Sequence, residues 1–254
     1  MEFLLPGRAA PVIYEGSLPS TNTALRELAQ QGAAHGTALI AGRQTGGRGR
    51  LGRSFESPPG GLYISVLYRP DCAPERSLPM TAGAAVAIRR AIARVCGHEP
   101  GIKWMNDLVS GGKKLCGILA EQTVSGAGTQ LVVGAGINVN TRPEDFPGEL
   151  RDRAGSILSL TGRETELSVL ARAVIAELDG IYAAALAGGA AFLEEYRAAC
   201  VSCGRDVLLL QNGSSRPARA LRVNDDFSLA VQTASGPEDV RFGEVSVRGA
   251  DGYL

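Results

Sequence analysis

The spacing of apolar residues divides the chain into a long part with helices and strands and a short part that is all strand. Apolar residues recur every three to four positions in the segments predicted to be helical, which are 21–31, 80–95, 167–187 and 190–200. Alternating or short apolar runs predict strands at 12–14, 37–41, 62–68, 102–105, 107–109, 115–123 and 130–139. Only short strands are expected after Gly204, at 206–210, 218–223, 228–232 and 240–247.

This order of elements predicts an α+β fold. Helices and strands do not alternate strictly, which argues against a doubly wound parallel sheet. We therefore expect a mixed, largely antiparallel sheet packed with helices over residues 1–203, and a small C-terminal β-barrel over 204–254. The chain has 254 residues, of which 44% are hydrophobic, and this is enough for one substantial core.

Charge and cysteine content exclude several classes of function. The formal net charge is zero and no apolar run is long enough to span a membrane, so neither nucleic acid nor a membrane is an expected partner. The first residues make a poor signal peptide, and an odd cysteine count fits a reducing compartment, so we expect a cytoplasmic protein. Cys200 and Cys203 have the C-x-x-C spacing of a redox or zinc pair, but without a second pair we expect ordinary thiols.

A stretch rich in glycine and arginine, GRQTGGRGRLGR, occupies residues 42–53. Its glycines let backbone N–H groups approach a ligand, and Arg48, Arg50 and Arg53 supply charge for a phosphate or carboxylate. The spacing also matches a dinucleotide fingerprint and nearly matches a P-loop. Both require a helix directly afterwards, which the prolines in segment 57–61 prevent. Two interpretations stay open: a loop that orders around an anionic ligand, or a solvated basic loop for nucleic acid.

Further motifs surround this loop in a fixed order. They are STN at 20–22, Gln44 with the loop at 47–53, KWMND at 103–107, KLCGIL at 114–119, GAGIN at 134–138 and GEVSVR at 243–248. Together they resemble the biotin protein ligases over nearly the whole chain. The sequence departs from the family pattern at Phe55, where tryptophan is usual, and at Met105, where proline is usual.

The resemblance implies both a fold and a reaction. It implies a catalytic domain similar to class II synthetases, an SH3-like C-terminal barrel and, since the STN motif starts at residue 20, no preceding DNA-binding domain. The implied reaction joins biotin and ATP into biotinyl-5'-AMP with Mg²⁺ and releases pyrophosphate. A lysine of the biotin carrier domain of a carboxylase then takes the biotin. A homodimer through the exposed edge of the central sheet is a further expectation from the family.

The resemblance also assigns roles to individual residues. Arg48 and Lys114 are the expected catalytic residues, and Trp104 is an expected core anchor. The residues expected to bind biotin are Ser20, Thr21, Asn22, Gln44, Arg48, Gly49, Arg50, Lys114, Gly117 and Leu119. Those expected on the nucleotide side are Arg50, Arg53, Phe55, Lys103, Asn106, Asp107 and Asn138, with Asp107 also toward Mg²⁺. Two structural alternatives stay open: a helix cap among residues 20–22 and a turn at Asp107.

Three rival functions remain. A lipoate or octanoate ligase of the same superfamily would share the fold and the acyl-adenylate chemistry. A nucleic-acid-binding module would use the arginine- and glycine-rich loop directly. A degenerate ligase would bind biotin without activating it, although Arg48, Arg50 and Lys114 are all present.

Overall fold

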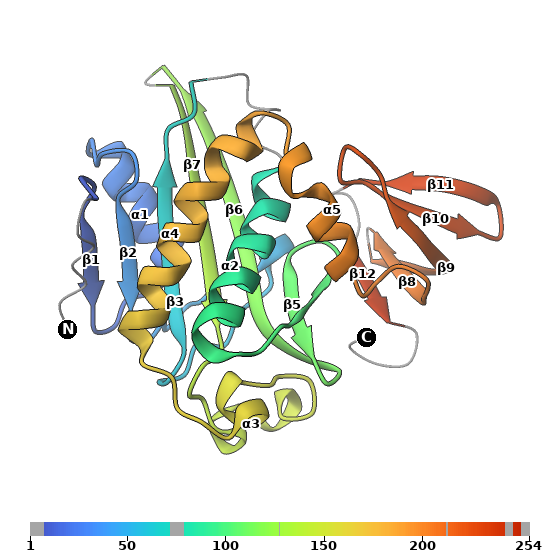
Figure 1. Ribbon diagram of the computed structural model, residues 1–254, viewed down its shortest axis with the longest axis horizontal. Coiled ribbons are helices and arrows are strands. Elements are labelled where there is room, and N and C mark those ends of the chain that lie inside the picture. Colours follow the sequence, from blue (N-terminus) through green and yellow to red (C-terminus); the bar gives the residue numbers. More distant parts are fainter. Residues whose placement is uncertain (1–7, 72–78, 127, 212, 242–245, 250–254) are drawn as a thin grey trace.

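The computed structural model describes residues 8–71, 79–126, 128–211, 213–241 and 246–249. A seven-stranded sheet carries the helices, and a smaller five-stranded sheet follows at the C-terminal side (Figure 1). This arrangement confirms the predicted α+β fold with a mixed sheet and a C-terminal β appendix. No described helix combines the length and the apolar character that a bilayer span requires.

The large sheet is mixed but mostly antiparallel. Its strand order is β1-β2-β3-β7-β6-β5-β4, and only the β1–β2 pair is parallel. The strands are β1 (Val12–Glu15), β2 (Ala38–Ala41), β3 (Leu62–Tyr68), β4 (Gly101–Lys103), β5 (Asp107–Ser110), β6 (Lys113–Ser125) and β7 (Gly128–Ile137). The central hairpin of β6 and β7 is the longest element of the sheet, and this is why it can extend under the whole site.

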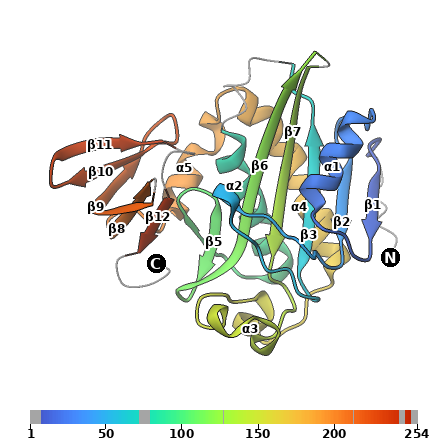
Figure 2. The ribbon, with the colours of Figure 1, turned by 180° about the vertical axis from the view of Figure 1, so that it is seen from behind.

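Helices cover the two faces of this sheet unequally. One face carries α2 (Met80–Cys96), α4 (Leu167–Leu186) and α5 (Ala190–Ala199), which bury the large core. The other face carries α1 (Thr21–Gln30), which packs a small apolar cluster of Leu25 and Ala29 on Leu39, Leu67 and Val132. In Figure 2 the long segment between β2 and β3 crosses this second face in front of β6 and β7. The second face is therefore covered by α1 and by this long segment rather than by a layer of long helices.

The smaller sheet is entirely antiparallel, in the order β11-β10-β9-β8-β12. Its strands are β8 (Asp206–Gln211), β9 (Ser214–Val223), β10 (Leu229–Thr233), β11 (Gly236–Val240) and β12 (Ser246–Gly249). It is attached to the large unit by Trp104, whose indole nitrogen donates to the carbonyl of Phe227 at 2.9 Å. Trp104 is buried in the large core, which confirms its predicted role as an anchor.

The four predicted helices are confirmed to within a residue or two at their ends, but two expectations need correction and one element was not predicted. The predicted strand 240–247 is wrong, because β11 ends at Val240 and β12 begins at Ser246 on opposite edges of the small sheet. The strand predicted to reach residue 105 ends at Lys103, where the chain turns. A short helix, α3 (Ile157–Thr161), was not predicted. Of the GEVSVR motif, residues 243–245 lie outside the described part.

Candidate active site

One cavity of about 430 Å³ lies on the second face, between the β2–β3 segment and the β6–β7 hairpin. This volume falls in the usual range for small-molecule sites, roughly 300–1,000 Å³. The structure brings every predicted site residue to its wall. These residues are Ser20, Thr21, Asn22, Gln44, Arg48, Gly49, Arg50, Arg53, Phe55, Lys103, Asn106, Asp107, Lys114, Gly117, Leu119 and Asn138.

Glycines on the two central strands make the floor. Alternate residues of a strand face the same side, so Gly134 and Gly136 of β7 both point at the cavity. A Cβ on Gly136 would overlap the ring of Phe55, and one on Gly117 would lie 2.9 Å from that ring. A Cβ on Gly134 would overlap the side-chain oxygen of Asn22. The roles of Gly134 and Gly136 were missed, although their two-residue spacing in the GAGIN motif was the available signal.

Gln44 closes the end of the cavity at the start of α1. Its side-chain oxygen accepts from the backbone nitrogen of Thr21 at 2.8 Å and from the Thr21 hydroxyl at 3.1 Å. Its amide nitrogen donates to the Ser57 hydroxyl at 2.9 Å. Ser20 lies at the capping position, but its side chain makes no capping hydrogen bond with the described residues of the helix. The loop residue Gln44 therefore satisfies the helix start, and Ser20 is left at the cavity wall.

Asn22 is held by contacts on both ends of its amide. Its nitrogen donates to the carbonyl of Leu119 and to the Glu121 carboxylate, each at 3.0 Å. Its oxygen lies 2.6 Å from the Ser65 hydroxyl, which donates to it. Asn22 is buried, so these bonds fix its orientation over the floor at Gly134. The buried Asn22 amide is thus a preorganised feature of the site rather than a surface group.

Glu121 of β6 is a site-supporting residue that sequence reasoning missed. Its carboxylate pairs with Arg48 of the loop at 3.1 Å and with Arg26 of α1 at 3.3 Å. The same carboxylate accepts from Asn22. One anion therefore joins the helix start, the central strand and the arginine-rich loop. Its only sequence signal was a lone acid two residues beyond Leu119, on the same strand face.

The opposite end of the cavity is cationic. The Lys114 ammonium forms an ion pair with Asp107 at 2.7 Å and lies 5.6 Å from the centre of the Phe55 ring. Arg50 donates to the side-chain oxygen of Asn106 at 3.1 Å. Burial lowers the pKa of Arg50, and the nearby Asp107 carboxylate partly offsets this shift. Arg50 is half-buried, and the charge of Arg53 also lowers its pKa, so this end of the cavity favours an anionic ligand.

Asn138 has a structural task in addition to its place on the wall. Its amide nitrogen donates to the carbonyls of Lys114 at 3.3 Å and Gly155 at 2.9 Å. These bonds hold the end of β7 beside β6 and beside the segment that precedes α3. Its side-chain oxygen is buried and has no hydrogen-bond partner among the described residues. Buried acceptors are normally satisfied, so this oxygen is an exception within the site.

A further part of the wall comes from the segment between β7 and α3. Phe146, Leu150, Arg153 and Ala154 reach the cavity from two short 3-10 turns, Pro143–Asp145 and Gly148–Leu150, and the loop after them. This wall is anchored where the Lys114 backbone nitrogen donates to the Arg153 carbonyl at 2.8 Å. No periodic pattern marks these residues in the sequence, and they were not predicted.

Comparison with known proteins places this chain in a defined class. A family model described as the biotin/lipoate A/B protein ligase family matches residues 15–138. The biotin–[acetyl-CoA-carboxylase] ligase of Mycobacterium tuberculosis is 31% identical over 233 residues, covering 89% of this chain and 85% of that protein. The bifunctional ligase/repressor BirA of Bacillus subtilis is 40% identical over 157 residues, covering 61% of this chain and 48% of that protein. The match thus spans about half the length of this second relative.

Solved structures agree with this result. The biotin protein ligase of Aquifex aeolicus in complex with biotin and ATP superposes with a TM-score of 0.77 at 29% identity, covering 94% of this chain and 99% of that one. The biotin protein ligase of Leishmania major in complex with biotin shares the fold, with a TM-score of 0.64 at 23% identity. This chain belongs to the biotin/lipoate protein ligase family.

Proposed function

We propose that this chain is an ATP-dependent biotin ligase that biotinylates a lysine on the biotin carrier domain of a carboxylase. The observation that carries the proposal is the convergence of Arg48, Arg50 and Lys114 on one glycine-floored cavity with a polar end at Asn22. Such a cavity offers a hydrogen-bonding end for a ring, at Asn22, and a cationic end for a carboxylate and phosphates. The biotin ligase relatives support this choice of substrates.

The first step joins the two small substrates. A biotin carboxylate oxygen attacks the α-phosphorus of ATP, the bond to the β-phosphate oxygen breaks, and pyrophosphate leaves. Both reactants are anionic, so Arg48 and Lys114 bring them together by neutralising their charge. The same two cations stabilise the charge that grows at the phosphorus centre and its leaving group. Positioning in the cavity removes much of the entropic cost of the encounter.

The second step transfers biotin to protein. The lysine amine of the carrier domain attacks the acyl carbon of biotinyl-5'-AMP, the acyl–phosphate bond breaks, and AMP leaves. Ser20, Thr21, Asn22, Gln44, Gly49, Gly117 and Leu119 are proposed to hold the biotin moiety. Arg50, Arg53, Phe55, Lys103, Asn106, Asp107 and Asn138 are proposed to hold the nucleotide, with Phe55 against its base.

Magnesium is proposed to enter with the nucleotide. Two carboxylates line the cavity, Asp107 and Glu56, and Asp107 is paired with Lys114. The described residues contain no group of three side chains able to hold a metal ion. These residues fit an ion held mainly by phosphate oxygens and water, with Asp107 as its protein ligand. Such an ion would supply charge neutralisation on the triphosphate.

The first test is ATP–pyrophosphate exchange with Mg²⁺, supplying biotin, lipoate or octanoate separately. Exchange with biotin alone is the expected result. Exchange with lipoate or octanoate instead would assign the chain to the other branch of its family. No exchange with any of the three acids would contradict the proposed adenylation.

Two variants test the assignment of the cations. Arg48→Ala and Lys114→Ala are each expected to lower the exchange rate by about 10²–10³-fold, the usual effect of removing one preorganised donor. Arg43→Ala and Lys113→Ala are the matched controls, because Arg43 and Lys113 are sequence neighbours outside the cavity wall. Near-normal exchange in both site variants, with folding unchanged by circular dichroism, would defeat the assignment.

The nucleic-acid alternative is less well supported. Arg48 pairs with Glu121 and Arg50 with Asn106, so two of the loop arginines are engaged at the cavity. Retention on RNA or DNA at physiological ionic strength, lost at higher salt, would revive that alternative.

We also propose that residues 204–254 form a small domain of their own, that the protein is cytoplasmic, and that it dimerises through a sheet edge. Light scattering would test the dimer.

A further inference from the structure

The C-x-x-C motif lies at a structural junction. Helix α5 ends at Ala199, and the chain turns through Cys200 and Cys203 before β8 begins. The two sulfur atoms lie 3.7 Å apart. Cys200 is buried and Cys203 is half-buried, and both are free thiols. This pair takes no part in the proposed ligase chemistry.

The turn between the two cysteines supports strand β4. The backbone nitrogen of Val201 donates to the Ile102 carbonyl at 2.9 Å, and the Val201 side chain packs against Gly101. The Ser202 hydroxyl accepts from the backbone nitrogen of Trp104 at 3.0 Å, and Ser202 is fully buried. Strand β4 leads directly into the cavity wall at Lys103 and Trp104. The cysteine turn is therefore one contact away from the nucleotide side of the site.

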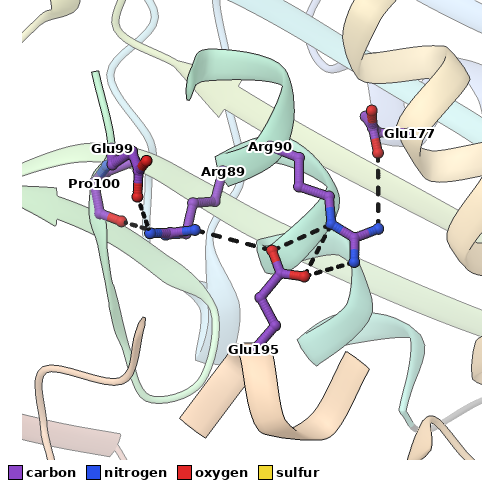
Figure 3. A network of polar contacts seen from close by, with 6 residues as sticks. All are labelled: Arg89, Arg90, Glu99, Pro100, Glu177 and Glu195. Carbon is purple, nitrogen blue, oxygen red and sulfur yellow. Dashed lines mark hydrogen bonds and ion pairs between the residues drawn. The ribbon is translucent and has the colours of Figure 1, made fainter. Parts of the chain in front are cut away.

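Helix α5, which precedes the turn, and the segment that leads into β4 both make polar contacts with helix α2 (Figure 3). Glu195 of α5 accepts from Arg90 at 3.0 Å and lies 3.9 Å from Arg89. Arg89 also donates at 3.1 Å to the carbonyl of Pro100, the residue before β4. The helix before the turn and the strand beside it thus share one scaffold. We therefore expect a change within the turn to affect its contacts with β4.

The two thiols have different reactivity. Hydrogen bonding to Cys200 lowers the pKa of Cys203, and the backbone amide of Val223 acts in the same direction. The hydrogen bond with Cys203 and burial raise the pKa of Cys200. The thiolate is the nucleophilic form of cysteine, so we expect Cys203, which is half-buried, to react before the buried Cys200, whose sulfur lies 3.7 Å away.

We propose that Cys200 and Cys203 form a reversible thiol–disulfide site that reacts with peroxides, and that the disulfide weakens nucleotide binding through β4. With hydrogen peroxide, the Cys203 thiolate attacks one oxygen, the O–O bond breaks, Cys203 becomes a sulfenic acid, and the released hydroxide takes up a proton and leaves as water. The Cys200 sulfur then attacks the Cys203 sulfur, the S–S bond forms as the S–O bond of the sulfenic acid breaks, and the hydroxyl leaves as a second water with the proton of the Cys200 thiol. The peroxide is reduced by two electrons and the pair of thiols is oxidised by two.

The geometry links this chemistry to the site. A disulfide needs a sulfur–sulfur distance of about 2.05 Å, so the two sulfur atoms, which lie 3.7 Å apart, must approach each other. We expect this approach to displace Val201 and Ser202, which lie between the two cysteines and hold Ile102 and Trp104. Loss of one such hydrogen bond corresponds to about a fivefold change in an equilibrium constant. We expect the KM for ATP to rise by at least that factor in the oxidised protein.

The disulfide is tested directly on the full chain, without reference to ligase activity. The protein is treated with hydrogen peroxide at several pH values and analysed by intact mass and peptide mapping. The expected product is one Cys200–Cys203 disulfide, formed faster at higher pH and reversed by dithiothreitol. Cys203→Ser is expected to abolish the product, Cys200→Ser to stop at an oxidised Cys203, and Cys96→Ser to behave as wild type. The proposal would be overturned if no intramolecular disulfide formed, or if the disulfide involved other cysteines. It would also be overturned if the reduced pair bound one zinc ion.

A second readout follows the junction itself. Trp104 is the only tryptophan of the chain and contacts Ser202 directly, so its fluorescence should change on oxidation and recover on reduction. The expected rise in the KM for ATP rests on the proposed function. It is measured by ATP–pyrophosphate exchange on the oxidised and the reduced protein. An unchanged tryptophan signal and an unchanged KM, with the disulfide formed, would refute the coupling to β4. A protein inactive in exchange but positive for the disulfide would refute the proposed function and leave the redox site standing.

Discussion

Replacing Gly134 by alanine tests whether the glycine floor and the fixed Asn22 amide work together. A Cβ at this position would lie well inside 3.0 Å of the Asn22 side-chain oxygen, a separation that real side chains do not show. Asn22 cannot easily rotate away, because its nitrogen is bonded to the Leu119 carbonyl and Glu121 and its oxygen to Ser65. The substitution must therefore break some of these bonds or move β7.

The expected cost follows from these contacts. Overpacking a filled site costs about 1–3 kcal/mol, and each lost hydrogen bond about 0.5–1.5 kcal/mol. We expect Gly134→Ala to lower the free energy of unfolding by about 2–3 kcal/mol. For a chain of this size that corresponds to a fall of roughly 5–10 °C in Tm. Because either outcome disturbs Asn22 or the floor beneath it, we also expect the Kd for biotin to rise at least about tenfold, the equivalent of 1.4 kcal/mol.

Differential scanning calorimetry and isothermal titration with biotin measure the two effects. Gly126→Ala is the matched control, since Gly126 lies at the end of the same hairpin and a Cβ there meets no atom within 4 Å. That control should stay within about 0.5 kcal/mol of wild type. A double variant with Asn22→Ala should be less destabilised than the sum of the two single changes, because the colliding oxygen is gone. Additive losses, or an unchanged Tm and Kd in Gly134→Ala, would refute the packing argument.

Three further predictions concern the loop and its contacts. Backbone amides of residues 44–53 should gain protection from hydrogen exchange when biotin and ATP are added together; the same exchange pattern with and without ligands would argue against loop ordering. Glu121→Gln should speed hydrogen exchange of these backbone amides when no ligand is added, because the ion pair with Arg48 is lost. Amides as protected as in the wild type would show that Glu121 does not hold the loop. Phe55→Ala should raise the KM for ATP more than that for biotin, and Phe55→Trp should restore it; equal effects on both substrates would place the ring elsewhere.

Much of the fold was predictable because apolar periodicity is a local property. Helices α2 and α4 carry apolar residues along most of their length and end near glycines, so their bounds follow from sequence. The prediction of one strand over 240–247 was wrong because alternation is also a local property. It does not show that the chain leaves one edge of the small sheet at the end of β11 and joins the other edge at β12. Helix α3 has only five residues, too few to show a helical period.

Some residues of the candidate site were predictable from the sequence and others were not, for a similar reason. The cations and polar residues were predictable because they belong to ordered motifs around the arginine-rich loop. Glu121 was not, since its value lies in joining Arg48, Arg26 and Asn22 from three separate elements. Phe146 reaches the wall only because the segment before α3 folds back on β6, a tertiary event without a periodic signature.

The two principal cations of the site share one feature, because each is paired with a carboxylate of the protein. Arg48 is paired with Glu121 and Lys114 with Asp107. The Arg48–Glu121 pair is partly exposed, with 44% and 19% of the two side chains accessible, and pairs of this kind are worth at most about 1 kcal/mol. A carboxylate or phosphate entering the cavity can therefore replace Glu121 at small cost and gain a charge-assisted hydrogen bond. It follows that the arginine-rich loop can close over an anionic substrate without first breaking a strong contact.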